Sequence, residues 1–151
     1  MTARPGILRR EAHALGVRLQ RVAVGEVGTF DRALATIASS GAEALMLMES
    51  SKFNAHRHGI LAFARTHRLP TACGVRIYAE AGCLMAYAPA ILEMFRRAAV
   101  FVEKILTGTK PGDLPIEQPA KFELVINLKT AQALGITIPP SLLFQADEVI
   151  R

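Results

Sequence analysis

The order of turns, strand and capped helix between Asp113 and Ile150 constrains this chain more than any other stretch. Leu114-Pro115 and Gln118-Pro119 predict an extended entry, because each proline fixes its own φ and disfavours the helical region for the residue before it. From Phe122 to Ile126 the more apolar side chains recur at every second position. That period predicts a strand with one face more deeply buried than the other.

A change of period at Asn127 predicts that a helix follows this strand directly. The Asn127 side chain can accept a hydrogen bond from an unpaired N–H in the first helical turn, and Leu128–Leu134 carries one apolar face. Gly135 is expected to end the helix, since glycine readily takes the positive φ that often follows one. Two prolines then forbid further helix, and we expect Ser141 to cap a last short helix over residues 141–149.

Upstream of residue 113, apolar residues switch between the spacing of strands and the spacing of helices. Strands are predicted over 17–24, 44–48, 71–75 and 83–87, and helices over 7–15, 30–40, 55–67 and 91–106. We expect Asn54 to cap the third of these helices, Gly25–Gly28 to form a loop, and residues 76–82 to form a connector. Alternation of strand and helix with short loops is typical of right-handed βαβ units around a parallel sheet, which is an α/β fold.

Two of these predicted elements are unusually apolar. Residues 44–48, ALMLM, contain no polar side chain, which predicts a strand covered on both faces. The helix Ile91–Leu106 carries one broad apolar face and should end before Gly108. The residues of that face are Leu92, Phe95, Ala99, Val102 and Leu106.

Length, composition and charge exclude several classes of protein. With 151 residues, 51% of them apolar, the chain can bury the core of one compact domain. No apolar run approaches the ~18–20 residues of a membrane span, and charges interrupt residues 1–10 where an export signal needs its apolar region. The net charge of +5 arises in residues 1–75, with ten Lys and Arg against five Asp and Glu, whereas residues 76–151 hold eight of each. The excess has no dense basic run, so we expect a solvated helical surface and no nucleic-acid binding.

Cysteine and histidine residues give no pattern for catalysis or metal binding. Cys73 and Cys83 lack the spacing of a zinc knuckle; two buried free thiols are expected, and a single disulfide stays possible in an oxidising compartment. His56 and His58 lie two residues apart, which points them to different sides of a helix. No spacing pairs a histidine with Cys73 as a nucleophile, and glycine-rich phosphate motifs are absent. The sequence therefore predicts no enzyme, no metal site and no cofactor.

Three segments together resemble a known family: the helix Arg96–Leu106, the run Pro115-Ile116-Glu117-Gln118-Pro119, and Phe122–Leu134 with Asn127 at the strand-to-helix joint. They closely resemble the carboxyl-terminal end of ABC-transporter substrate-binding proteins with the type I periplasmic binding protein fold, the group that includes tryptophan- and phenylalanine-binding members. The earlier segments LMLMESSKFNAHRHGIL and GCLMAYAP look like the second lobe of the same family. The resemblance thus covers nearly the whole chain.

This resemblance implies a parallel-sheet, three-layer α/β lobe over residues 1–88, followed by a crossover helix, strand and carboxyl-terminal segment over residues 89–151. Family members also carry an export or lipoprotein signal and a complete first lobe, both of which we expect this chain to lack. Their ligand lies between two lobes that close like a clamp, and the transporter's membrane subunits recognise the closed form. The resemblance implies a periplasmic location; without a signal peptide, the chain would be cytoplasmic if Met1 is the true start.

The carboxyl ends of the parallel strands show where such a lobe would contact a ligand, because loop backbone and helix N-termini are exposed there. Serine hydroxyls and an asparagine amide can bind an amino or carboxylate group, an arginine can face a carboxylate, and a tyrosine can pack on an apolar or aromatic side chain. Each also has a structural explanation, as turn former, helix cap or interface filler. The predicted ligand contacts are Ser50, Ser51, Asn54, Arg76 and Tyr87, with Tyr78 as an alternative to Tyr87.

The expected function is solute binding for an ABC importer, with a small solute such as an amino acid and the membrane subunits as partners. A single lobe supplies only half of the clamp, and a ligand shifts an open–closed equilibrium only by its different affinity for the two states. The alternative is a non-binding remnant or a self-associating structural module. The bare apolar face of Ile91–Leu106 then predicts a homodimer or a domain-swapped oligomer.

Overall fold

The structure is a computed structural model that describes residues 5–24 and 29–151, in two compact units, residues 1–41 and 42–151. The first unit contains helices α1 (Pro5–Ala14) and α2 (Thr29–Ser39), as the helical spacing predicted. Gly16 follows α1 with a φ of 70°, in the left-handed region that glycine tolerates. The loop predicted at Gly25–Gly28 lies outside the described residues.

The strand predicted over residues 17–24 is wrong, because this segment has no regular secondary structure. Its alternation already slips at Arg21, where two polar residues stand together. A strand is stabilised by hydrogen bonds to a neighbouring strand, and residues 17–24 take no place in the sheet. Apolar alternation without a partner strand therefore did not produce a strand here.

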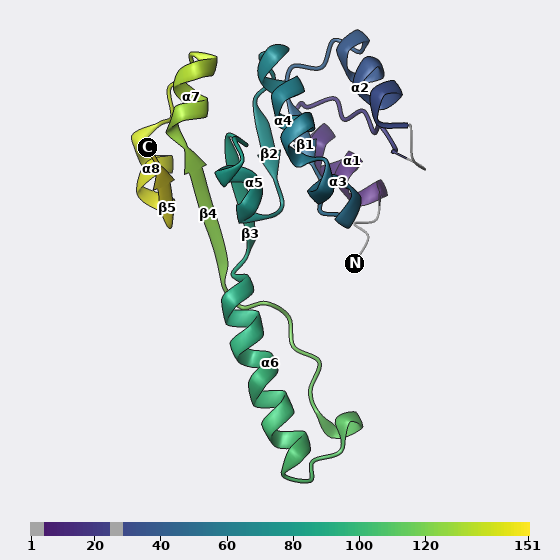
Figure 1. The fold of residues 1–151 in the computed structure, drawn as a ribbon, viewed down its shortest axis with the longest axis vertical. Coiled ribbons are helices and arrows are strands. Elements are labelled where there is room, and N and C mark those ends of the chain that lie inside the picture. The colour runs from purple at the N-terminus through teal and green to yellow at the C-terminus, as the bar shows by residue number, and fades with distance from the viewer. Residues whose placement is uncertain (1–4, 25–28) are drawn as a thin grey trace. The chain divides into compact units, whose positions relative to one another are not determined.

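The second unit is built on a five-stranded sheet with the strand order β1-β2-β3-β4-β5 (Figure 1). The pairs β1–β2, β2–β3 and β4–β5 are parallel, whereas β3 and β4 are antiparallel, with Met85 opposite Ile126 and Pro89 opposite Phe122. The strands are β1 (Leu45–Leu47), β2 (Thr71–Cys73), β3 (Met85–Pro89), β4 (Phe122–Asn127) and β5 (Glu148–Ile150). The α/β fold predicted from the sequence is confirmed, and its sheet, predicted as parallel, is mostly parallel with one antiparallel pair.

Helices connect these strands and cover both faces of the sheet. They are α3 (Ser51–Ala55), α4 (Arg57–Thr66), α5 (Arg76–Glu80), α6 (Ile91–Leu106), the 3-10 turn η1 (Pro111–Asp113), α7 (Leu128–Leu134) and α8 (Pro140–Gln145). Ile126 packs in an apolar cluster with residues of α7 and α8, while the next residue, Asn127, donates from Nδ2 to the Ala79 carbonyl of α5 at 2.9 Å. Since successive strand residues point to opposite faces, α8 and α5 lie on opposite sides of β4.

The joint between β4 and α7 forms as the sequence predicted. The Asn127 Oδ1 accepts a hydrogen bond from the Thr130 N–H at 3.0 Å, and Gly135 ends α7 in the left-handed region with a φ of 72°. Asn127 is buried, so one amide side chain satisfies an unpaired donor of α7 and also holds α5.

Four local predictions around the sheet are wrong in detail. Asn54 does not cap a helix; Ser50 caps α3 instead, and Asn54 lies inside α3, which ends at His56 before α4 begins. The connector over 76–82 contains a helix, α5. Ser141 lies inside α8, which begins after Pro139 with no side-chain cap, and the chain then forms β5 where the sequence predicted further helix.

Strand β1 is less covered than its apolar sequence predicted. Leu47 is buried, but Met46 is 58% exposed, so only one face of this strand is shielded within the structure. β1 is also an edge strand, paired with β2 alone. The continuous apolar sequence therefore predicts that β1 is a strand, but it does not predict how much of the strand is buried.

The expectation of two free thiols is also wrong, because Cys73 and Cys83 form a disulfide. Cys73 ends β2 and Cys83 stands just before β3, and these two strands are parallel neighbours. The side chains meet only after residues 74–82 return the chain to the adjacent strand. Their spacing in sequence does not show this approach.

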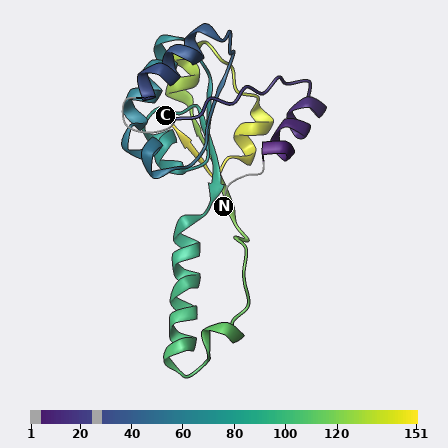
Figure 2. The same cartoon turned by 90° about the vertical axis from the view of Figure 1, so that its right-hand side faces the viewer.

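Helix α6 and the segment that follows it form an arm that extends from the sheet at the β3–β4 ladder (Figures 1 and 2). Arg97 of α6 makes an ion pair with Glu117 of the return segment, which holds the two sides together. The predicted apolar face of α6 is exposed, with Leu92 at 71% and Phe95 at 70% of full exposure. Among the described residues, no helix is both long and apolar enough to cross a membrane.

Candidate functional site

A cavity of about 240 Å³ lies where β1 and β2 end. These strands are parallel, so the segments that follow them meet at one edge of the sheet. The cavity is lined by Glu49, Ser50, Ser51, Asn54, Val75, Ile77 and Tyr78. Three of the five predicted ligand residues, the two serines and the asparagine, are thereby brought together.

Ser50 shapes the rim of this cavity because it caps α3. Its backbone is extended, with φ −159° and ψ 152°, and its Oγ accepts a hydrogen bond from the Phe53 N–H at 3.1 Å. This arrangement turns the chain sharply after β1 and leaves Ser51 as the first residue of α3. The Ser50 hydroxyl hydrogen is not used by the cap, so the group can still donate to a ligand.

Asn54 lies one helical turn after Ser50, on the same rim. Its Oδ1 is 3.4 Å from Arg57 Nη1, and its backbone carbonyl accepts from the same nitrogen at 2.9 Å. Arg57 thus orients the carboxamide, whose two N–H groups are donors. Ser50, Ser51 and Asn54 together present a polar edge with both donor and acceptor capacity.

Tyr78, which was predicted only as an alternative to Tyr87, forms a buried wall of the cavity. Its side chain is 1% exposed, and its hydroxyl has no hydrogen-bond partner among the described residues. Burial raises the pKa of this phenol, the charge of Glu49 raises it further, and Arg57 acts in the opposite direction. The hydroxyl is therefore neutral at physiological pH and lacks a partner that a bound molecule can supply.

The signal for Tyr78 was present in the sequence but weak. Tyr78 and Tyr87 are the only tyrosines of the chain, and no local pattern favours the first over the second. Because residues 76–82 were interpreted as a connector, nothing indicated that α5 would turn Tyr78 inward.

Arg76 and Tyr87 do not line the cavity. Arg76 Nε donates to Glu80 at 3.0 Å, and its guanidinium also pairs with Glu148 of β5; the bond to Glu80 is the main reason that the Arg76 pKa is raised. Tyr87 is 64% exposed and stacks on Phe122, with ring centroids 5.4 Å apart, at the base of the arm. Both residues remain predicted contacts outside the cavity.

A second, wider groove of about 340 Å³ lies between α4 and α7, over Thr71 and Gly82. Thr71 begins β2 and Gly82 precedes β3, so this groove lies at the amino ends of the parallel strands. Ligands of open α/β sheets bind at the opposite, carboxyl ends. We therefore take the cavity beside Tyr78 as the candidate site.

Across residues 5–24 and 29–151, no group of three or more His, Cys, Asp and Glu is placed to hold a metal ion. His56 and His58 are both exposed. The cavity lining offers hydrogen-bonding groups, the Glu49 carboxylate and apolar side chains.

The sequence profile of a protein family described as ABC transporter substrate binding protein matches residues 4–150. The chain belongs to this family. The substrate-binding proteins of this family are typically not enzymes.

Several solved structures are similar in fold to this chain. A conserved domain protein from Vibrio cholerae is similar with a TM-score of 0.86 and 24% identity, over 95% of this chain and 48% of that one. An ABC domain from Streptococcus pneumoniae, solved in complex with L-Trp, is similar with a TM-score of 0.88 and 23% identity, over 96% of this chain and 49% of that one. A substrate-binding protein with adhesive properties from Clostridium difficile, ligand-free and open, is similar with a TM-score of 0.68 and 14% identity, over 96% of this chain and 48% of that one.

This member of the substrate-binding family spans about half the length of those solved structures, and it matches one lobe of a periplasmic binding protein. No protein of curated function matches it.

Proposed function

We propose that this lobe contributes one wall of a solute-binding site for an ABC transporter, and that the wall is the cavity lined by Ser50, Ser51, Asn54 and Tyr78. The observation that carries the proposal is that Tyr78, which lines the cavity, has a buried hydroxyl with no hydrogen-bond partner among the described residues. A buried polar group without a partner costs about 1–3 kcal/mol, so a ligand that supplies the partner recovers part of that cost.

The ligand class follows from the lining. Serine hydroxyls and the Asn54 amide can bind a carboxylate, the Glu49 carboxylate can bind an ammonium group, and Val75 and Ile77 offer apolar contact. This combination fits a small amino acid or a similar organic molecule. The related Streptococcus pneumoniae protein, solved with L-Trp, supports the amino-acid class without fixing the side chain.

We further propose that Arg76 and Tyr87 act only when a second lobe closes over the cavity. Arg76 is engaged by two carboxylates, so it reaches a ligand only by exchanging one of them. Tyr87 is exposed near the arm and can contact an apolar part of a ligand from the side. Closure on a solute by two lobes, and recognition of the closed form by membrane subunits, belong to the same proposal.

The disulfide supports a location outside the cytoplasm. Structural disulfides persist in oxidising compartments and are rare where cellular thiol systems keep cysteines reduced. The bridge between Cys73 and Cys83 is therefore what we expect of an extracytoplasmic protein, and family membership favours the same location.

The proposal is tested by thermal-shift measurements against the common amino acids and small organic acids. A solute at about 100 times its dissociation constant should add ~2.7 kcal/mol to the free energy of unfolding. Ser51→Ala should reduce this stabilisation for the same solute, whereas Ser141→Ala, on α8 and away from the cavity, should not. Absence of any shift across the panel, for a folded protein, would contradict solute binding by this lobe.

One observation favours a second candidate function, a self-associating structural module. The apolar face of α6 is exposed along its length, and no residue of α6 is buried. Two copies that pair these faces would remove the apolar surface from water. Under this alternative the protein is an oligomer in light scattering and shows no stabilisation by any solute.

A further inference from the structure

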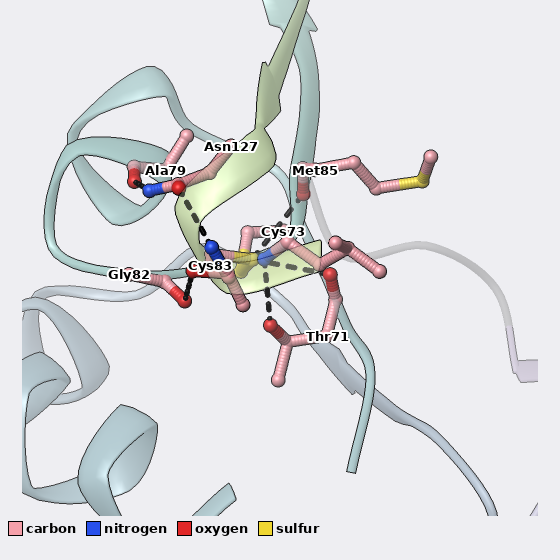
Figure 3. Close-up of a disulfide and its surroundings, with 9 residues drawn as sticks. Thr71, Cys73, Ala79, Gly82, Cys83, Met85 and Asn127 are labelled. Atoms are coloured by element: carbon pink, nitrogen blue, oxygen red, sulfur yellow. Dashed lines mark hydrogen bonds between the residues drawn. A yellow bond between two sulfur atoms is a disulfide. The ribbon is translucent and has the colours of Figure 1, made fainter. Parts of the chain in front are cut away.

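The disulfide between Cys73 and Cys83, shown in Figure 3, closes a loop that carries part of the cavity lining. Cys73 and Cys83 are ten residues apart, and the segment between them, residues 74–82, contains α5. Three of the seven residues that line the cavity belong to this segment: Val75, Ile77 and Tyr78. The bridge therefore fixes both ends of a loop whose middle faces the candidate ligand.

Cys83 is also joined directly to Tyr78. The Cys83 N–H donates to the Tyr78 carbonyl at 2.8 Å, which places the bridge one hydrogen bond from the residue with the unpaired hydroxyl. At the carboxyl end of the segment, Asn127 Nδ2 donates to the Ala79 carbonyl at 2.9 Å and Thr130 Oγ1 donates to the Gly82 carbonyl at 3.0 Å.

The two ends of the segment are thus held differently. Asn127 and Thr130 anchor its carboxyl end to β4 and α7, and these bonds do not depend on the disulfide. Near its amino end, the side-chain attachment is the sulfur of Cys73, the last residue of β2. Cleavage of the bridge should loosen the amino end, which carries Val75, before it affects the sheet.

The fold can also accommodate the reduced form. Cys83 Sγ lies 3.4 Å from the Thr71 carbonyl oxygen and 3.2 Å from the Met85 carbonyl oxygen. A thiol at this position finds an acceptor already in place, so reduction does not bury an unpaired donor there. Thr71 also accepts the Leu84 N–H at its Oγ1, at 2.9 Å, which ties β2 to the start of β3 without sulfur.

We propose that the Cys73–Cys83 disulfide is a redox-sensitive positioning element for the cavity: oxidised, it holds Tyr78 in the wall, and reduced, it releases the segment and weakens solute binding. The positioning of Tyr78 stands on the geometry alone, whereas the effect on solute affinity rests on the proposed function. By linkage, a solute that binds the oxidised wall also protects the disulfide from reduction.

The reductant is a dithiol. One thiolate of the dithiol attacks a bridge sulfur, the Sγ–Sγ bond breaks, one cysteine leaves as a thiolate, and the other is held in a mixed disulfide with the reductant. The second thiolate of the dithiol then attacks the reductant's sulfur in this mixed disulfide and releases the second cysteine. Cys73 and Cys83 together gain two electrons and two protons as thiols, and the reductant becomes a disulfide. Both cysteines are buried, at 5% and 0% exposure, so attack requires the segment 74–82 to open first.

The experiment uses the tyrosines, because the chain has two of them and no tryptophan. In a Tyr87→Phe background, Tyr78 alone gives tyrosinate absorbance. The oxidised protein should show a phenol pKa above the ordinary value of about 10, since burial raises it. After reduction, or in the variant Cys73→Ala/Cys83→Ser, whose serine keeps a donor at position 83, we expect the pKa to fall towards the ordinary value. An unchanged pKa would overturn the proposal.

Hydrogen exchange of the same samples excludes a trivial loss of fold. Amides of residues 75–82 should exchange roughly tenfold faster after reduction, a coupling of typical size, while the β3–β4 ladder keeps its protection. Loss of protection in both regions would show that the disulfide stabilises the fold as a whole, which would overturn the positioning role. The control variant Thr107→Ala keeps both cysteines and is altered at the end of α6, away from the bridge. It should change neither the Tyr78 pKa nor the exchange of these amides.

The effect on solute affinity is tested with L-tryptophan as the probe, by calorimetry on oxidised and on reduced protein. Weaker binding after reduction, by roughly tenfold, supports the complete proposal. Equal binding in both forms overturns the effect on affinity. If neither form binds L-tryptophan, the amino-acid proposal fails for that ligand, and the Tyr78 titration still decides whether the bridge positions the wall.

Discussion

The Tyr78 hydroxyl is buried and has no hydrogen-bond partner in the part of the chain that the structure describes, so its removal should help the unliganded fold. We expect Tyr78→Phe to raise the free energy of unfolding by about 1 kcal/mol in urea denaturation, because an unpaired buried hydroxyl costs roughly 1–3 kcal/mol. The same variant should bind the solute less tightly than the native chain. Tyr87→Phe, at an exposed position, should change stability by less than about 0.5 kcal/mol. A clear loss of stability in Tyr78→Phe would show that the hydroxyl is paired in the folded protein.

Asn127 has two separate bonds that a pair of variants can tell apart. Asn127→Ala loses the cap of α7 and the buried bond to Ala79, so we expect a loss of roughly 2–3 kcal/mol in the free energy of unfolding. Asn127→Ser keeps a capping hydroxyl but not the reach to α5. Its loss should be smaller by about 1 kcal/mol, the usual contribution of a cap. Equal losses would mean that the cap contributes nothing here.

The arm formed by α6 and its return segment should be sensitive to acid. The hydrogen bonds that Arg97 donates to Glu117 are the main reason that the pKa of this carboxyl is below its ordinary value of 4.5. A lowered pKa means that the unfolded arm binds more protons than the folded one as the pH falls. The stabilisation is therefore complete above about pH 4.5 and is lost as the pH drops through the lowered value.

Limited proteolysis of residues 107–121 against pH measures this effect. We expect faster cleavage as the pH falls below the ordinary value of 4.5, and a flat profile in Glu117→Gln, which cannot titrate. Glu93→Gln removes a carboxylate that pairs within α6, with Arg96, and should keep the pH dependence of the native arm. An identical profile for native protein and Glu117→Gln would rule out this ion pair as the cause.

Elements whose signals are local could be predicted from the sequence. β4 and α7 follow from alternation, an asparagine cap and a glycine stop within fourteen consecutive residues, 122–135, and α6 is bounded as its apolar spacing indicated. Elements that depend on distant neighbours could not. β5 exists because β4 lies beside it, and residues 17–24 alternate like a strand but have no strand to pair with.

At the scale of the whole molecule, the candidate site could be predicted in part for the same reason. The rule that ligands lie at the carboxyl ends of parallel strands located Ser50, Ser51 and Asn54, since they belong to α3 and its cap, the first helix after β1. Tyr78 needed knowledge of α5, and the disulfide needed the return from β2 to β3. Both depend on how elements pack, which no local pattern in the sequence records.

The exposed face of α6 predicts association of the whole molecule if two copies pair through it. Leu92 and Phe95 are among the most exposed apolar side chains of α6, and burial of such a side chain contributes roughly 1.5–3 kcal/mol. In a two-fold dimer each substitution acts twice. Leu92→Gln/Phe95→Gln should therefore raise the dimer dissociation constant by at least about 100-fold in sedimentation, because ~1.4 kcal/mol is a factor of ten.

Glu103→Gln is the matched control for this measurement, since it changes an exposed polar residue of the same helix and should leave the dissociation constant unchanged. A native protein that sediments as a monomer at every concentration would remove self-association through α6 as an explanation. The apolar face would then have to be covered by a different surface, and solute binding would be tested with that surface present. Concentration-dependent association that both variants retain would instead place the contact elsewhere on the chain.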